Sequence, residues 1–146
     1  MISFGADVLY AAVNADAPQF AVARELVMKY ESSTDVVLSE ETLVALYGAL
    51  ARTRVQDAAS VVRYFRGNPN WRVVDAQSNR VAMNAIWDCA FANGEDVQTI
   101  HRRRLLATLQ RNGVTTFYTG AAEAFRAIGC AFARNPFEEL KVKVKG

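Results

Sequence analysis

Short strand-like segments alternate with helical patterns along the whole chain, and this alternation restricts the fold more than any other feature. Apolar, β-branched and aromatic residues predict strands at 2–4, 35–38, 71–74, 114–119 and 130–133. The intervals carry apolar residues three and four positions apart, which is the pattern of amphipathic helices. Strands separated by helices usually pair in parallel, so the order predicts an α/β protein whose central parallel sheet has helices on both faces.

Individual residues mark several helix ends. Ser39 is suited to cap a helix N-terminus, and Glu40 and Glu41 would then lie in the first turn, where the helix dipole favours negative charge. Gly94 and Gly113 each follow a helical pattern, and Gly113 is placed for the left-handed conformation that ends many helices. These residues support the predicted order of strands and helices.

Composition and charge set broad limits on the kind of protein. The 146 residues are 51% hydrophobic and 22% charged, which is typical of one globular domain. We expect this domain at 1–137 and a charged tail at 138–146, where lysine and valine alternate as in an edge strand or a frayed end. A net charge of +2 permits contact with nucleic acid without requiring it. No apolar run approaches the ~20 residues of a membrane span, so a cytoplasmic protein is expected.

Aromatic and sulfur-containing residues are expected to serve the core. Phe20, Phe65, Trp71, Trp87 and Phe117 lie on apolar faces of the predicted elements, so we interpret them as core residues and not as platforms for nucleic-acid bases. Two cysteines without a CxxC spacing and a single histidine exclude an ordinary Cys/His zinc site. The cysteines are expected to be buried free thiols.

Five segments together carry a recognisable pattern. They read ISFGADVLYA at 2–11, SEETLVALY at 39–47, IHRRRLLATLQRNGVT at 100–115, FYTGAAEAF at 117–125 and ARNPF at 133–137. In this order and at this spacing they resemble PIN-domain proteins, in particular the VapC-type toxin ribonucleases of type II toxin–antitoxin systems. Each segment alone is a weak signal, but together they span nearly the whole chain. The resemblance implies a single PIN-like domain.

The resemblance also indicates where such enzymes carry the acids that hold a divalent metal ion. The family pattern FDAN is FGAD here, so Gly5 takes the place of the first metal-binding Asp. Ala45 stands at a family Glu, Arg102 at a family Asp, and Ala121 and Ala124 at a family Asn and Asp. Because Mg²⁺ is bound through hard oxygen ligands, the resemblance implies the scaffold without its usual metal site, and we expect no cofactor.

The expected function is that of a degenerate, catalytically inactive PIN protein that acts by binding protein or RNA. The alternative is an active Mg²⁺- or Mn²⁺-dependent endoribonuclease whose acids have moved. Its candidates are Asp7, two residues past Gly5, Glu41, on the helical face of Ala45, and Glu123, beside another family acid position. Their structural interpretations are a turn acid bonded to backbone, a first-turn acid and a solvated surface charge. A regulatory module unrelated to RNA is a third hypothesis.

Arg102, Arg103 and Arg104 form the strongest charge feature of the chain. Successive helical residues point in different directions, so at most two of the three can reach one cleft. Arg102 could act as a built-in cation that pairs with Asp7 or Glu41. Alternatively, the three arginines could contact phosphates, or they could form a solvated basic face.

The resemblance further implies a set of partners. VapC-type proteins usually form homodimers through their N-terminal helices, and a homodimer is expected here. They also bind a small antitoxin whose arginine enters the acidic pocket. That mode of recognition should fail in this chain because the acids are replaced and Arg102 already supplies a cation. An antitoxin-like peptide bound in another way, or RNA, remains the expected partner, and no membrane partner is expected.

Overall fold

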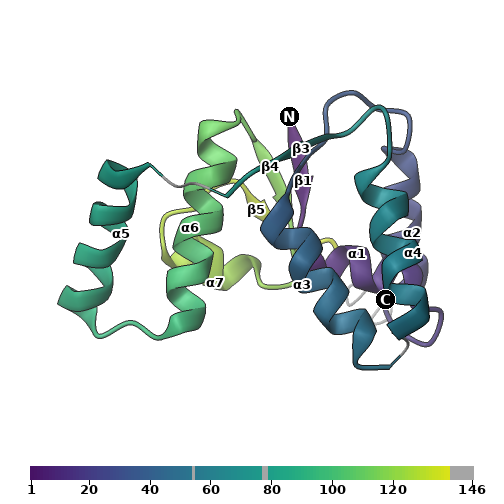
Figure 1. The fold of residues 1–146 in the computed structure, drawn as a ribbon, viewed down its shortest axis with the longest axis horizontal. Coiled ribbons are helices and arrows are strands. Elements are labelled where there is room, and N and C mark those ends of the chain that lie inside the picture. Colours follow the sequence, from purple (N-terminus) through teal and green to yellow (C-terminus); the bar gives the residue numbers. More distant parts are fainter. Residues whose placement is uncertain (54, 77–78, 139–146) are drawn as a thin grey trace.

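The computed structural model describes residues 1–53, 55–76 and 79–138, and it contains short strands alternating with longer helices (Figure 1). The strands are β1 (Ile2–Phe4), β2 (Val37–Ser39), β3 (Arg72–Val74), β4 (Thr116–Tyr118) and β5 (Ala133–Arg134). The helices are α1 (Ala6–Val13), α2 (Phe20–Lys29), α3 (Glu40–Ala51), α4 (Val55–Arg66), α5 (Arg80–Asn93), α6 (Val97–Arg111) and α7 (Ala122–Ala127). The predicted tail at 138–146 lies outside the described residues except for Glu138.

All strand pairs are parallel. The order β1-β4-β5 forms one sheet, and β2 pairs with β3. A single parallel bridge between Ile2 and Val36 joins the two groups, supported by a 2.7 Å hydrogen bond from the Ile2 amide to the Asp35 carbonyl. The overall order is therefore β3-β2-β1-β4-β5. The direction of the strand order reverses between β1 and β4, and in such sheets the ligand site lies beyond the carboxyl ends of the strands at this reversal.

Both faces of the sheet are buried, as is usual for parallel strands. Phe4, Val36 and Leu38 belong to a core shared with α1 to α4, whereas Val37 and Phe117 belong to a second core shared with α6 and α7. Figure 1 shows α1 to α4 on one side of the strands and α6 and α7 on the other, with α5 outside α6. The predicted parallel sheet with helices on both faces is confirmed.

Several predicted helix ends are also confirmed. The hydroxyl oxygen of Ser39 accepts a hydrogen bond from the Glu41 amide at 3.2 Å, which is the geometry of an N-terminal cap. Gly94 and Gly113 have φ angles of +60° and +73°, in the left-handed region where glycine meets no steric penalty.

Other sequence-based predictions need correction. The strand predicted at 130–133 is shorter and later, because the chain turns at Gly129 (φ +100°) and reaches the sheet only at β5. Trp87 is 42% exposed and Phe20 is only half-buried, so neither is a core residue. Helix α5 packs mainly on α6, and it does so through Ile86 and Ala90. Trp87 is the next residue after Ile86, so it lies on another face of the helix and stays exposed. Phe65, Trp71 and Phe117 are buried as predicted.

Both cysteines are free thiols. Cys130 is buried, but Cys89 is only half-buried on α5. Within the described ranges, no helix has the length and apolar character that crossing a membrane requires.

Candidate functional site

The candidate site lies where β1 and β4 end. The amide of Gly5 donates to the carbonyl of Tyr118 at 2.8 Å, so the pairing of the two strands continues to their carboxyl ends. Asp7 follows in the first turn of α1, while Thr119 and Gly120 follow β4. The topology therefore brings together two of the five segments recognised in the sequence, although more than 110 residues separate Asp7 from Gly120.

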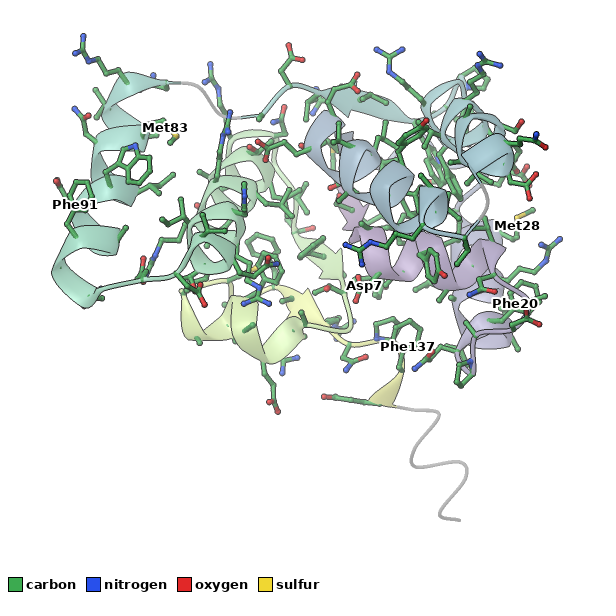
Figure 2. The ribbon with its side chains drawn as sticks, turned by 60° about the horizontal axis from the view of Figure 1, so that its bottom comes forward. Asp7, Phe20, Met28, Met83, Phe91 and Phe137 are labelled. Carbon is green, nitrogen blue, oxygen red and sulfur yellow. The ribbon has the colours of Figure 1, made fainter. Side chains whose placement is uncertain are left out.

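The carboxylate of Asp7 is held by three donors. The Gly120 amide donates to Oδ2 at 2.6 Å, and the hydroxyl of Thr119 donates to Oδ1 at 3.3 Å. The amide of the buried Val8, next in the first turn of α1, donates to Oδ1 at 3.0 Å. Thr119 Oγ1 in turn accepts the amide of Ala121 at 3.1 Å. Asp7 thus ties the start of α1 to the loop that precedes α7 (Figure 2), as an acid bonded to backbone.

The position of Asp7 depends on the glycines around it. A Cβ atom at Gly5 would lie 2.6 Å from Asp7 Oδ1, and one at Gly120 would lie 2.8 Å from Oδ2. Both distances are shorter than a nonbonded contact allows, so either side chain would displace the carboxylate. The carboxylate of Asp7 therefore occupies the space beside position 5 where a side chain at that position would begin.

Glu41 is paired with Arg104 and not with Arg102, which corrects one of our expectations. The Arg104 guanidinium lies 3.0 Å from the Glu41 carboxylate, and both side chains are about one-third exposed. The reason is the position of the arginines on α6, which begins at Val97 and so places them beyond its first turn. Two positions along a helix rotate a side chain by roughly 200°, so Arg102 and Arg104 project from nearly opposite sides.

Arg103 is engaged by a different acid. Its Nε and Nη2 atoms donate to the two carboxylate oxygens of Glu95 at 2.8 and 2.6 Å, and the side chains are only 20% and 10% exposed. The sequence did not indicate this pair, because eight residues separate its members and Glu95 lies before the helix. Two of the three arginines are therefore paired with carboxylates, and phosphate binding by the run stays a prediction.

The three candidate relocated acids are not gathered into one site. Glu123 is exposed in the first turn of α7, Asp7 is bonded to the loop after β4, and Glu41 is paired across to α6. In the part of the chain that the structure describes, no three His, Cys, Asp or Glu side chains are placed to hold a metal ion. The described donors therefore do not fit a bound Mg²⁺, which needs several oxygen ligands in octahedral geometry.

The residues at the family acid positions are placed as follows. Gly5 is buried at the end of β1, whereas Ala45 is exposed on α3, one turn after Glu41. Arg102, Ala121 and Ala124 are half-buried. The partners of Asp7 were missed in the sequence because they are a threonine hydroxyl and a backbone amide that only the sheet topology brings near.

The Glu95–Arg103 pair predicts how stability varies with pH. The hydrogen bond from Arg103 holds the pKa of Glu95 below its ordinary value of 4.5. A carboxyl whose pKa is lowered on folding stabilises the fold above its unfolded pKa and loses that contribution as pH falls through the folded pKa. Glu95→Gln should therefore destabilise the protein more at neutral pH than at an acidic pH below 4.5. Urea unfolding at both pH values measures this; Glu25→Gln, an exposed acid on α2, is the control. A Glu95→Gln effect that stays constant with pH would contradict the assignment.

Comparison with known proteins gives likenesses of structure but none of sequence. No family model matches the chain, and no curated protein sequence matches it. The fold is similar to the crystal structure of Mycobacterium tuberculosis VapC20, described as a toxin that cleaves the sarcin-ricin loop. The TM-score is 0.68 at 18% sequence identity, and the match covers 88% of this chain and 95% of that one. At this identity the likeness concerns the fold alone. The chain thus has the parallel α/β fold of the PIN-domain protein VapC20.

Proposed function

We propose that this protein is a degenerate VapC-like PIN protein that acts by binding a macromolecule and does not cleave RNA. One observation carries the proposal: the carboxylate beside the end of β1 is held by the Gly120 amide, the Thr119 hydroxyl and the Val8 amide. An acid used in this way joins two segments of the fold. Among the described residues it is not assembled with other carboxylates into a group that would attract a divalent cation.

Charge at the same edge of the sheet supports the proposal. Glu41, the acid on the helical face of Ala45, is neutralised by Arg104 at 3.0 Å. A guanidinium at this distance competes directly with a metal ion for the carboxylate. The positions that carry acids in the family pattern hold glycine, alanine and arginine. A metal-activated water would therefore have neither its metal nor its base here.

The proposed partners follow from the same features. A toxin whose pocket is acidic can receive an arginine from its antitoxin, but at this edge of the sheet Glu41 is already paired with Arg104 and the carboxylate of Asp7 is bonded to Gly120 and Thr119. A peptide partner would therefore have to bind elsewhere on the surface. We also propose a homodimer formed through the N-terminal helices, where Met28 and Tyr47 are large apolar side chains that remain 40% and 42% exposed.

The alternative function is a metal-dependent endoribonuclease with relocated acids. One observation favours it: the carboxylate of Asp7 lies within 2.6 Å of the Cβ position of a side chain at residue 5. Asp7 could then serve as the ligand that replaces a side chain at position 5. Glu41 and Glu123 could join it as ligands only if the ion pair of Glu41 opens and Glu123 turns inward.

Calorimetric titration of Mn²⁺, run in parallel with incubation on structured RNA, tests the two functions. The wild-type protein is expected to show no saturable metal binding and no metal-dependent cleavage. Asp7→Ala is expected to lower the free energy of unfolding by about 1 kcal/mol through the lost hydrogen bonds, without changing either assay. Asp16→Ala, in the exposed loop after α1, controls for the loss of a surface acid. Saturable Mn²⁺ binding and cleavage that both disappear in Asp7→Ala would establish the alternative.

A further inference from the structure

A polar groove separate from the candidate site lies between α2, the ends of β4 and β5, and the segment after β5. Its volume is about 560 Å³. Lys29 lines it from the end of α2, Tyr118 from β4, Arg134 from β5, and Asn135 from the following segment. Phe137, labelled in Figure 2, marks this last segment. Neither Asp7 nor any of the family acid positions lines the groove.

Three cations and two carboxylates line the groove. Lys29, Arg126 and Arg134 contribute positive charge, and Glu25 and Glu138 contribute negative charge, so the formal balance is +1. Arg126 is fixed in place, because its Nε and Nη2 atoms donate to the carbonyl of Ala133 at 3.2 and 3.0 Å. A guanidinium has five donors, so two bonds to one carbonyl leave others for a ligand.

Tyr118 adds a neutral polar side chain beside these cations, with its hydroxyl hydrogen-bonded to Tyr30. Burial is the main cause that raises the pKa of Tyr118, and a hydrogen bond with Tyr30 adds to it, so the phenol stays protonated. Arg134 and Lys29 lie close enough to act on this hydroxyl electrostatically. The Lys29 ammonium is held over the ring of Tyr30, 5.6 Å from its centre.

The wall after β5 is also ordered by hydrogen bonds. The side-chain amide of Asn135 donates to the carbonyl of Gly120 at 3.3 Å, and its oxygen accepts the amide of Phe137 at 2.9 Å. Arg134 therefore lies between the paired strand β5 and a turn that is fixed by the hydrogen bonds of Asn135. Both limit how far the backbone of Arg134 can move. These bonds fix the shape of this wall of the groove.

We propose that this groove binds a phosphate group. Arginine and lysine are the residues that most often bind phosphate oxygens, and Arg126 and Arg134 can each offer several N–H donors to one phosphate group. The phosphate can belong to a free nucleotide or to the backbone of RNA, and the two sources make the same contacts in the groove. Binding here goes beyond the proposed function and does not depend on whether a metal site exists.

Two probes distinguish the sources of the phosphate. Binding of AMP is measured by calorimetry, and binding of a fluorescein-labelled single-stranded oligoribonucleotide is measured by anisotropy over a range of salt concentrations. Arg134→Gln and Lys29→Gln are each expected to weaken binding roughly ten-fold. For RNA, each loss of a phosphate contact should also reduce the slope of log K against log salt by about one. Arg134→Lys, which keeps the charge, should retain most of the affinity.

Arg24→Gln is the matched control, because Arg24 is an exposed cation on the same helix that does not line the groove. Thermal unfolding of each variant verifies that the fold is kept. Binding of both probes assigns a phosphate site that accepts nucleotides; binding of RNA alone assigns it to a nucleic-acid backbone. Absence of binding to both probes overturns the proposal, as does an equal loss in Arg24→Gln and Arg134→Gln. None of these variants changes Asp7, Glu41 or Glu123, so the Mn²⁺ titration should not depend on them and the two proposals can fail separately.

Discussion

Metal binding should appear when the family acids are restored together in this scaffold. The variant carries six substitutions: Gly5→Asp, Asp7→Asn, Ala45→Glu, Arg102→Asp, Ala121→Asn and Ala124→Asp. The wild-type chain already has the parallel sheet with its strand-order reversal, so the new oxygens would converge at the edge where Asp7 now lies. Restoring several hard ligands at once is needed, because one carboxylate binds Mg²⁺ or Mn²⁺ too weakly to saturate.

The first two substitutions must be made as a pair. A Cβ atom at position 5 would lie 2.6 Å from Asp7 Oδ1, so the Asp7 side chain would have to move. The new carboxylate beside it would also repel the charge of Asp7. Asp7→Asn removes the competing charge and keeps an acceptor for the Gly120 amide. Gly5→Asp alone is therefore expected to destabilise the protein, and Asp7→Asn should recover part of that loss.

The gain can be measured without any assay of activity. At a Mn²⁺ concentration of 100 times Kd, binding to the folded state adds about 2.7 kcal/mol to stability. For a chain of this size that corresponds to a rise in Tm of roughly 5–10 °C. The control is the variant with the last four substitutions only, which keeps Gly5 and Asp7. Equal responses of wild type, control and full variant to Mn²⁺ would show that the five sequence segments do not align with the family pattern as we have placed them.

Phe4→Ala should unfold the protein at a much lower temperature than any surface substitution. Phe4 is completely buried at the end of β1, and its ring lies 6.0, 5.7 and 5.9 Å from the rings of Tyr30, Trp71 and Tyr118. Truncating such a residue leaves a cavity among rigid rings and costs about 3–5 kcal/mol. The expected decrease in Tm is roughly 6–20 °C, measured by thermal unfolding followed by circular dichroism.

Phe20→Ala is the control for loss of an aromatic side chain. Phe20 is only half-buried and its described ring contact is with Arg24, 5.7 Å from the ring centre, so its truncation should cost clearly less. Phe4 is followed directly by Gly5, whose amide bonds to Tyr118 of β4. Packing of Phe4 in the core therefore also helps to position Gly5 at the candidate site. Comparable costs for the two substitutions would mean that the aromatic group around Phe4 is not the centre of the core.

The sequence was sufficient for the order of elements and for most of their ends. Ser39 predicted its helix start and Gly113 its helix end, because capping and left-handed backbone depend on a few neighbouring residues. The alternation of strands and helices likewise determined the parallel sheet, because parallel strands need a crossover between them. Trp87 was misplaced, since periodicity shows a helical face but not whether another element covers it.

For the candidate site, too, the sequence determined the residue types and the tertiary structure determined the long-range contacts. The sequence by itself determined that positions 5, 45 and 102 hold Gly5, Ala45 and Arg102, and it is the resemblance that predicts acids of the family at these positions. Only the tertiary structure decided that Asp7 is bonded to Gly120 and that Glu41 is neutralised by Arg104. These contacts join residues far apart in the chain, and they depend on which strands are neighbours and on how a helix is rotated, which local patterns do not fix.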